Sequence, residues 1–375
     1  MRCLHICNDL LGSKVHENLY FNLQNLGNSQ TLYYPLRKNK IQKVEALNDD
    51  LKNLLLISKP LNTSHRLFFR KKINHLFKDL KEQVDFSQYN IAHATTLFSD
   101  GAVALRIWKQ YGVPYIVAIR GTDVNLFLKY RFDLYPLAKE IICNAKQLVF
   151  ISDSLKKNFI NSKFIATLNH YKIPNCQVIV NGLDPFWIQN TNKKKNLKRP
   201  TKFLYIGKFN ANKNVLRLVH AFLKINREHK NLELNLVGHG GNQEKAIKKI
   251  AIKNEHCINF HGPIYDKKEL QQMYLANDVF VMTSISETFG LVYVEALTQG
   301  LPILFTENQG IDGTFKERVG EAVNPKSINS IQQGLGKLFK NYHEYEIDKI
   351  DFSKFSWNRI AKTYHDLYQT FLKEK

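Results

Sequence analysis

The chain has 375 residues, of which 44% are hydrophobic and 12% aromatic, and its 54 lysines and arginines against 33 aspartates and glutamates give a formal net charge of +21. This length exceeds what one hydrophobic core usually organises, so we expect two domains, and the apolar fraction excludes a disordered chain. The five cysteines are an odd number without a C-x-x-C pair, which argues against a disulfide framework or a zinc ribbon.

The basic charge is spread over both halves of the sequence. It favours anionic lipid or phosphorylated substrates as partners, whereas a nucleic-acid site would concentrate the charge in one place. Residues 1–9 turn polar too early for a secretory signal, and no run of about 18 apolar residues could span a membrane. The sequence therefore predicts a cytoplasmic protein, free or peripheral at the inner face of the cytoplasmic membrane, with no nucleic-acid partner.

Short apolar strands alternate with amphipathic helical stretches along the chain, which is typical of parallel sheets covered by helices. The expected strands of a first series are residues 3–7, 31–34, 91–94, 115–119, 147–151 and 178–180. Those of a second series are residues 203–206, 232–237, 257–260, 279–282 and 303–305. We therefore predict an α/β protein with two doubly wound, Rossmann-like domains facing a central cleft, with ligands at the carboxyl ends of the strands.

A polar, basic segment that ends in proline separates the two series of strands. It predicts a linker at residues 189–200. The linker divides an N-terminal domain, residues 1–188, from a C-terminal domain, residues 201–350.

Residues 65–81 stand apart because apolar residues at helical spacing lie amid a dense basic face. Such helices bind anionic membrane surfaces, which gives the hypothesis that this segment lies on a membrane. The alternative is an ordinary surface helix whose phenylalanine and leucine side chains belong to the core.

Residues 204–222 are expected to form a strand, a polar loop and a helix, with Lys208 and Lys213 in the loop. Two ammonium groups there can neutralise a diphosphate and stabilise the charge that grows on a leaving group. Either lysine taken alone is more simply explained as a solvated surface charge.

Residues 279–302 are the most informative stretch, with a strand, a short polar loop and a helix. Glu295 lies among apolar residues of that helix, and a buried carboxylate is costly unless it is hydrogen-bonded, so a ribose diol is a suitable partner. Glu287, in the loop, would reach sugar hydroxyls. A phosphate is favoured at the helix N-terminus, where the free backbone N–H groups belong to Phe289, Gly290 and Leu291.

The Glu287 and Glu295 pair, the G-K-F-x-x-x-K loop at residues 207–213 and the Val-Gly-His-Gly turn at residues 237–240 together resemble the donor-binding domain of retaining glycosyltransferases of family 4, which have the two-domain GT-B fold. The resemblance covers nearly the whole chain. It implies that residues 351–375 form the terminal helix that packs back on the N-terminal, acceptor-binding domain. Another stretch, Glu-Asn-Gln-Gly-Ile-Asp-Gly before Thr314, resembles capsule and lipopolysaccharide members of the family.

The resemblance implies roles in binding a nucleotide-diphosphate sugar. Glu295 would hold the ribose, Glu287 the donor sugar, and Lys208 and Lys213 the diphosphate. The remaining donor-binding positions that it implies are Phe289, Gly290, Leu291, Gly207, Gly238, Pro263, Ile264 and Gly12.

In the first domain the resemblance points to His93, Arg120 and Asp123 as acceptor or cleft residues. His93 ends a strand, and a lone histidine there is more often structural. Arg120 stands where the family has histidine, and it either holds an anionic group or pairs with Asp123. Two further departures are Lys208 in place of arginine, which loses bidentate geometry, and Asn214 in place of a common glycine.

These features predict a retaining glycosyltransferase that transfers a hexose-type sugar from a UDP-sugar or GDP-sugar to a glycan or lipid-linked acceptor in bacterial surface-polysaccharide synthesis. No D-x-D triplet occurs in the sequence, so we expect no metal and no cofactor besides the donor. One alternative is a nucleotide-sugar epimerase of similar fold, which would need no acceptor. The other is a non-catalytic, basic, membrane-associated binding protein.

Overall fold

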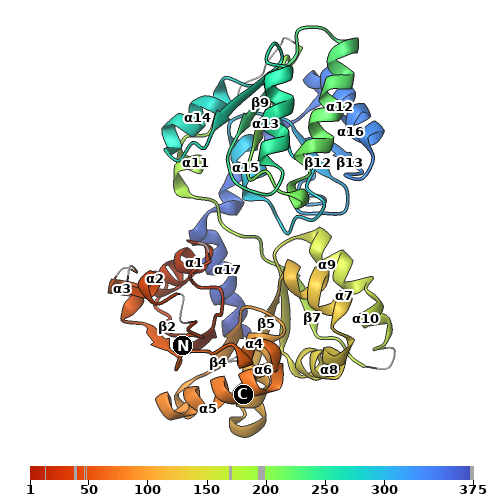
Figure 1. Cartoon of the computed structure of the whole chain (residues 1–375). Coiled ribbons are helices and arrows are strands. Elements are labelled where there is room, and N and C mark those ends of the chain that lie inside the picture. The colour runs from red at the N-terminus through yellow and green to blue at the C-terminus, as the bar shows by residue number, and fades with distance from the viewer. Residues whose placement is uncertain are drawn as a thin grey trace. The chain divides into compact units, whose positions relative to one another are not determined.

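The computed structural model describes residues 1–12, 14–37, 40–45, 47, 49–168, 171–192 and 199–371. Its internal contacts divide the chain into two compact units (Figure 1). Unit 1 comprises Met1–Ile151, Leu155–Gly182 and Trp357–Lys375, and unit 2 comprises Ser152–Ser154 and Leu183–Ser356. Half of the predicted linker, residues 193–198, lies outside the described residues.

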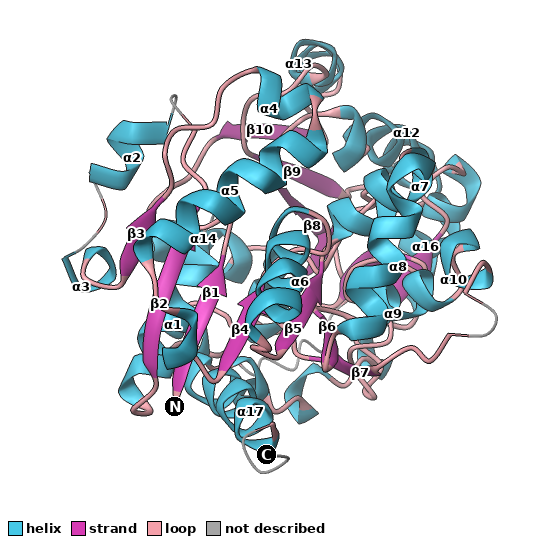
Figure 2. Ribbon diagram, turned by 90° about the horizontal axis from the view of Figure 1, so that it is seen from below, coloured by secondary structure: helices cyan, strands magenta, loops and turns pink. Residues whose placement is uncertain are grey.

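Unit 1 is built on a seven-stranded parallel sheet with the strand order β3-β2-β1-β4-β5-β6-β7, which Figure 2 shows side by side. The strands are β1 (Arg2–Ile6), β2 (Ser29–Tyr34), β3 (Leu55–Ile57), β4 (Ile91–Ala94), β5 (Tyr115–Ile119), β6 (Gln147–Phe150) and β7 (Asn175–Val178). Every residue of the central strands β4, β5 and β6 is buried, because helices cover both faces of the sheet.

The helices of this part of the chain are α1 (Lys14–Asn25), α2 (Ile41–Glu45), α3 (Asp49–Lys52), α4 (Ser64–Leu67), α5 (Phe69–Gln83), α6 (Ser99–Tyr111), α7 (Leu128–Tyr130), α8 (Tyr135–Asn144), α9 (Asp153–Ile160), α10 (Lys163–Ala166) and the C-terminal α17 (Trp357–Thr370). Helix α6 contacts α5, α8 and strands β4 and β5, whereas α1 contacts α17. Helix α17 contributes Trp357, Ile360, Tyr364 and Tyr368 to the core that covers β1 and β2. The last helix of the chain is therefore part of unit 1.

Unit 2 is built on a six-stranded parallel sheet with the order β10-β9-β8-β11-β12-β13. The strands are β8 (Lys202–Ile206), β9 (Glu233–Val237), β10 (Ile258–Gly262), β11 (Val279–Val281), β12 (Ile303–Thr306) and β13 (Gly320–Val323). The helices are α11 (Pro185–Gln189), α12 (Val215–Glu228), α13 (Glu244–Lys253), α14 (Lys267–Leu275), α15 (Leu291–Thr298) and α16 (Ile328–Lys340). Both units thus have the doubly wound, Rossmann-like arrangement that the sequence predicted.

Three strands differ from the prediction, and all three are at sheet edges. Strands β3 and β13 were not predicted, and β7 ends where the expected strand 178–180 begins. Strand β13 has one fully buried residue and β7 has none, so neither shows the continuous apolar run that marks a central strand. Strand β3 has only three residues, too few to show a period.

The basic segment 65–81 is interrupted at Phe68, whose extended backbone separates α4 from α5. The apolar side chains of α5 point into unit 1, where Ile73, Leu76, Phe77 and Leu80 are buried. The segment therefore forms a surface helix whose apolar face belongs to the core. The packing of α5 agrees with the second interpretation given for residues 65–81, an ordinary surface helix, because its apolar side chains are not available to a membrane.

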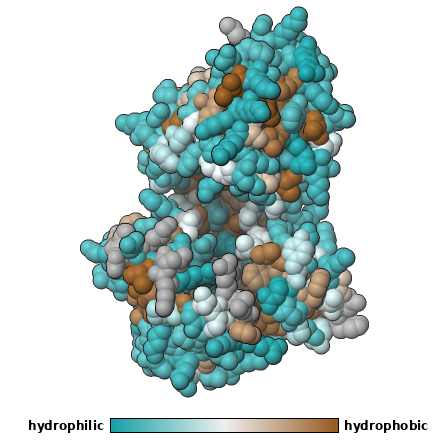
Figure 3. Space-filling model, in the orientation of Figure 1, coloured by the Kyte–Doolittle hydropathy of each residue, from teal (hydrophilic) through white to brown (hydrophobic). Residues whose placement is uncertain are grey.

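The visible surface of the protein is mainly hydrophilic, with hydrophobic side chains in small groups (Figure 3). No helix within the described part of the chain is both long and apolar enough to cross a membrane.

Candidate functional site

Two loops of unit 2 meet at the carboxyl ends of neighbouring strands, the loop after β8 and the loop after β11. Asn212 joins them, because its Nδ2 donates to the Ser286 carbonyl oxygen at 2.9 Å and its Oδ1 accepts from the Ser286 N–H at 3.1 Å. The Ile285 N–H also donates to the Asn212 carbonyl oxygen at 2.7 Å. The loops that carry the predicted lysines and Glu287 are therefore held together as one structure.

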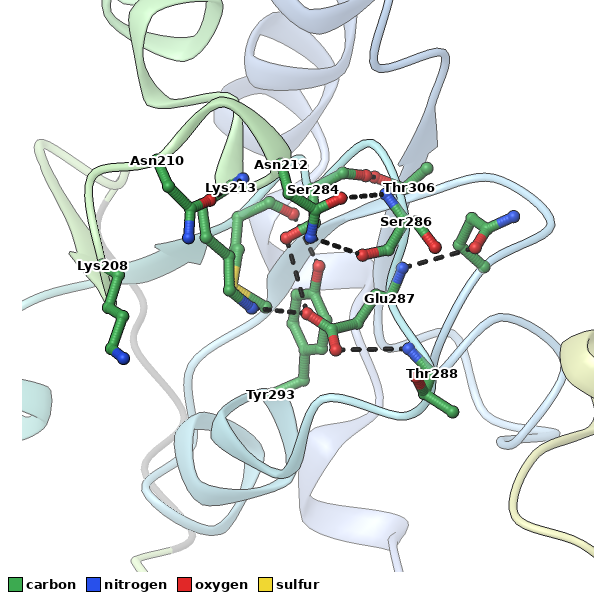
Figure 4. A network of polar contacts seen from close by, with 12 residues as sticks. Lys208, Asn210, Asn212, Lys213, Ser284, Ser286, Glu287, Thr288, Tyr293 and Thr306 are labelled. Carbon is green, nitrogen blue, oxygen red and sulfur yellow. Dashed lines mark hydrogen bonds and ion pairs between the residues drawn. The ribbon is translucent and has the colours of Figure 1, made fainter. Parts of the chain in front are cut away.

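Within these loops Lys213 Nζ lies 2.7 Å from Glu287 Oε2 (Figure 4). Both side chains are largely shielded, with 26% of Lys213 and 15% of Glu287 exposed. Asn210 fixes the turn that carries the lysine, since its Oδ1 accepts from the Lys213 backbone N–H at 2.9 Å. The structure thus brings together one predicted lysine and one predicted glutamate.

Glu287 is positioned by residues that the sequence analysis did not assign to the site. Its backbone carbonyl accepts from the Gly310 N–H at 2.9 Å, and its own N–H donates to Gln309 Oε1 at 3.3 Å. Its Oε1 accepts from the Thr288 N–H at 3.2 Å. A Cβ atom on Gly310 would lie 3.0 Å from Glu287 Cγ, so the glycine leaves room for the glutamate side chain. Gln309 and Gly310 are too far from Glu287 in the sequence for a periodic pattern to link them to it.

Lys208 lies in the same loop as Lys213, but its side chain is exposed and does not contact the other side chains drawn in Figure 4. Its ammonium group makes no hydrogen bond or ion pair with any residue that the structure describes, although its backbone carbonyl accepts from the Tyr205 hydroxyl at 2.8 Å. Only one of the two predicted lysines therefore contacts the glutamate.

Helix α15 begins directly after this loop, at Leu291. Gly290 precedes the helix with a φ of 82°, and its carbonyl accepts the first helical turn bond from the Tyr293 N–H. The N–H groups of Phe289, Gly290 and Leu291 make no hydrogen bond within the described ranges of the chain. Free donors at a helix N-terminus favour an anion, and the phosphate site that the sequence predicts here stays a prediction.

Glu295 lies in the same helix, and its Oε2 accepts a hydrogen bond from the Tyr274 hydroxyl at 3.1 Å. Burial raises the pKa of Glu295 to about 7, against the opposing effect of that hydrogen bond. No other hydrogen bond to this carboxylate occurs among the described residues, so it can accept more from a ligand. Tyr274, of α14, is a second site residue that the sequence analysis did not identify.

Two of the predicted glycines, Gly207 and Gly238, lie at the same edge of the unit 2 sheet. The Gly238 N–H donates to the Gly262 carbonyl at 2.8 Å, and a Cβ atom on Gly238 would lie 2.0 Å from the Gly207 carbonyl oxygen. Pro263 and Ile264 follow in the loop after β10. Three strand ends therefore approach one another so closely that a side chain at Gly238 is excluded.

Two further features of this edge were missed or left open by the sequence. Tyr265 is 78% exposed, and its hydroxyl lies 2.6 Å from His239 Nε2, which links the loops after β9 and β10. Asn214, which replaces a common glycine, has a left-handed φ of 60°, a conformation that asparagine tolerates. Its Nδ2 donates to the carbonyls of Thr283 and Pro325, so the replacement adds contacts.

Comparisons with known proteins find a family match and similar glycosyltransferases. Residues 188–350 match the family Glycosyl transferases group 1. The lipopolysaccharide 1,2-N-acetylglucosaminetransferase of Salmonella typhimurium is 25% identical over 65% of this chain and 72% of that protein. The putative teichuronic acid biosynthesis glycosyltransferase TuaC of Bacillus subtilis is 22% identical over 76% of this chain and 71% of that protein. The chain is a glycosyltransferase of the GT-B type.

Solved structures show the same fold. The lipopolysaccharide outer core galactosyltransferase WaaB superposes with a TM-score of 0.74 at 16% identity and covers 99% of both chains. Anabaena HepE, solved in complex with UDP, superposes with a TM-score of 0.71 at 13% identity and covers 99% of this chain and 100% of that one. At these identities the likeness shows that the glycosyltransferase has the GT-B fold.

In unit 1 of the glycosyltransferase, Arg120 and Asp123 do not form the side-chain ion pair that the sequence left open. Asp123 Oδ2 accepts from the backbone N–H groups of Arg120 at 2.9 Å and Leu97 at 3.1 Å, and burial raises its pKa to about 7. The Arg120 guanidinium donates through Nε to the Thr95 carbonyl at 3.1 Å. Asp123 thus shapes the backbone, and the other guanidinium nitrogens of Arg120 make no hydrogen bond to a described residue.

His93 of the glycosyltransferase is a core residue. It is 1% exposed, and its Nδ1 lies 2.7 Å from the Tyr368 hydroxyl on α17. Its register partner on β1 is His5, and burial lowers the pKa of both imidazoles. His93 therefore ties the sheet to the C-terminal helix, which is the structural role that the sequence analysis weighed against a substrate role.

Gly12 lies in the loop after β1, where its N–H donates to the Asp9 carbonyl at 2.9 Å. A Cβ atom there would lie 2.1 Å from Asp9 Oδ1, so the carboxylate of Asp9 closes over the glycine.

Among the described residues no group of three or more His, Cys, Asp or Glu side chains could hold a metal ion.

Proposed function

We propose that the protein is a retaining, metal-independent glycosyltransferase that moves a hexose-type sugar from a UDP-sugar or GDP-sugar to a glycan or lipid-linked acceptor. The observation that carries this proposal is the Lys213–Glu287 pair, at 2.7 Å, directly before the free N–H groups of α15. A cation, a carboxylate and backbone donors in one rigid loop system match the charges and hydroxyls of a nucleotide sugar.

Each part of the donor has a suitable partner in unit 2. Lys213 and the N–H groups of Gly290 and Leu291 would bind the diphosphate, and Glu287 the hydroxyls of the sugar. Glu295, with free acceptor capacity, would bind the two ribose hydroxyls, and a diol would favour its ionised form. The base would lie against the loop at Pro263 and Ile264, where the exposed Tyr265 offers a ring for stacking.

In the reaction the acceptor hydroxyl oxygen bonds to the anomeric carbon while the bond from that carbon to the β-phosphate oxygen breaks. The electron pair remains on the phosphate oxygen, the hydroxyl proton passes to the same phosphate, and the nucleoside diphosphate leaves. Attack from the side of the leaving group retains the anomeric configuration and requires no protein nucleophile. The Lys213 ammonium stabilises the growing phosphate charge, which is the role a metal ion has in other transferases.

The setting that we propose is bacterial surface-polysaccharide synthesis at the cytoplasmic face of the membrane. The relatives named for teichuronic acid and lipopolysaccharide support it. The general basic charge of the chain also suits anionic or lipid-diphosphate acceptors.

The first test is a thermal-shift screen of UDP-, GDP- and ADP-sugars, because a ligand that binds only the folded state raises the melting temperature. We expect one nucleotide class to stabilise the wild type and to have no effect on Glu295→Ala and Lys213→Ala. Lys249→Ala, an exposed lysine of α13, is the control that should respond like the wild type. If no nucleotide sugar raises the melting temperature of any of the four proteins, the proposed donor site is refuted.

The donor found in this way is then incubated with candidate acceptors in excess EDTA, and the anomeric configuration of the product is read by NMR. Transfer with retention in EDTA supports the proposal. Sugar conversion without any acceptor would instead indicate an epimerase, and an inverted product or a requirement for metal would contradict the proposed mechanism.

A further inference from the structure

Unit 1 carries large apolar side chains on its surface in the segment that follows β5. Within seven residues Leu126 is 53% exposed, Tyr130 61% and Phe132 62%. They lie on the π-helical turn Asp123–Phe127, helix α7 and the turn after it. A fourth side chain, Phe68, is 62% exposed at the break between α4 and α5. Exposed side chains of this size in one region usually mark an interaction surface.

The two segments are neighbours in the structure. The Phe69 ring meets Phe98 edge-on at 6.5 Å between centroids, and Phe98 stacks on Phe127 at 4.9 Å. The pKa of Asp133 is lowered first by its hydrogen bond from Arg131 and also by the charge of Arg70 on α5. The start of α5 therefore lies near the segment that follows β5, and the exposed side chains of the two segments, Phe68, Leu126, Tyr130 and Phe132, are together called the apolar patch.

Exposed cations lie beside residues of the apolar patch. Arg70, Lys71 and Lys129 are exposed, and Lys129 Nζ lies 5.2 Å from the centre of the Tyr130 ring. Arg131 is neutralised by a bidentate pair with Asp133, at 2.7 Å for both bonds. The exposed charge beside the patch is therefore positive, and a second copy of the same surface would be repelled.

We propose that the apolar patch, with Arg70, Lys71 and Lys129, docks the protein on an anionic lipid surface. Aromatic and leucine side chains are stabilised when they leave water and enter the lipid interface. The adjacent cations remain in the headgroup region, where anionic lipid attracts them. The apolar face of α5 takes no part, because it is buried in unit 1. The surface is thus formed by loop and turn residues around α7, with the basic start of α5 beside it.

The test is co-sedimentation of the full chain with vesicles of phosphatidylcholine alone and of phosphatidylcholine with phosphatidylglycerol, without donor or acceptor. We expect binding only to the anionic vesicles, weakened by salt. Combined Leu126→Ser, Tyr130→Ser and Phe132→Ser should reduce binding by at least tenfold, and Lys129→Glu by at least about fivefold, since one surface cation contributes about that factor.

Ile252→Ser is the matched control, because Ile252 is 72% exposed on α13 of unit 2 between Lys249 and Lys253. It should bind like the wild type. Phe68→Ser tests the patch independently, because Phe68 lies outside the segment that carries the other three side chains. For every variant, an unchanged melting temperature shows that the protein is folded. Absence of vesicle binding by the wild type, or equal binding by all folded patch variants, would overturn the proposal. Either failure would leave the donor-site proposal intact, because no nucleotide is involved.

Discussion

Lys213 Nζ and Glu287 Oε2 lie 2.7 Å apart although the residues are separated by 74 positions in the chain. The ion pair holds both side chains in place in the ligand-free protein, and it is partly shielded from water. A donor diphosphate would approach a lysine that already has a counter-ion. The pair therefore acts as a preformed unit, and its two members should not behave independently.

The Lys213–Glu287 pair can be tested by a double-mutant cycle. We expect Lys213→Met and Glu287→Gln each to lower kcat at least about 100-fold, because charge stabilisation of a leaving group is lost or misplaced. The double variant should be little worse than the worse single variant. Steady-state kinetics with the identified donor measure this, and additive losses would show that the two residues act separately.

The raised pKa of Glu295, about 7, predicts pH-dependent donor binding. The ionised carboxylate is the better acceptor for two ribose hydroxyls, so the affinity for a nucleotide sugar should rise as pH increases through about 7 and level off above it. Calorimetric titration at several pH values measures this. In Glu295→Gln the pH dependence should disappear, and an unchanged profile would assign it to another group.

The raised pKa of Glu295 also predicts how the free energy of unfolding of the ligand-free protein depends on pH. The folded-state pKa of Glu295 lies above its value in an unfolded chain, so its contribution to the free energy of unfolding is present below about pH 4.5 and decreases as pH rises towards about 7. The difference in unfolding free energy between wild type and Glu295→Gln should therefore change across this range. Urea denaturation at pH 5 and pH 8 measures it.

The buried imidazoles of unit 1 predict loss of stability in acid. Burial lowers the pKa of His5 and of His16 to about 3 and that of His93 well below its usual value. The contribution of these neutral side chains is complete above about pH 6.5 and is lost as pH falls below it, because the unfolded chain binds the protons more readily. The urea midpoint should fall steadily between pH 6.5 and pH 5, and a flat midpoint would contradict the burial of this cluster.

Tyr368→Phe should destabilise unit 1 by about 1–3 kcal/mol, because it leaves Nδ1 of the buried His93 without its partner. His93→Phe with Tyr368→Phe removes both polar groups and should recover part of the loss. Thermal and urea unfolding measure both variants. A neutral Tyr368→Phe would show that the contact between the sheet and α17 does not depend on this hydrogen bond.

Gly238→Ala should destabilise unit 2 by about 3 kcal/mol or more and abolish donor binding, because the new Cβ would lie 2.0 Å from the Gly207 carbonyl oxygen. Gly240→Ala is the control in the same turn. It also has a positive φ, of 72°, but nothing lies within 4 Å of a Cβ there, so backbone strain alone should cost about 1–2 kcal/mol. If the two substitutions lower the free energy of unfolding equally, the close approach of Gly238 to the Gly207 carbonyl is not the cause of the loss.

Local patterns were enough to predict most of the fold. Central strands such as β4 and β5 appear at the predicted bounds, because a strand buried on both faces must be apolar throughout. The edge strands β3, β7 and β13 were missed or shifted, since partial exposure removes this requirement. The helix break at Phe68 and the burial of the apolar face of α5 depend on contacts with the rest of unit 1.

The sequence by itself determined the class of fold and indicated the residue types of the candidate donor site, because both follow from short-range constraints: periodicity, strand–loop–helix order and acidic or basic residues at strand ends. Only the tertiary structure decided which of these residues meet. It paired Glu287 with Lys213 and left Lys208 apart, placed Gln309 and Gly310 behind Glu287, and joined His93 to Tyr368. Such contacts join residues that are distant in the chain, and their geometry depends on how whole strands and helices pack.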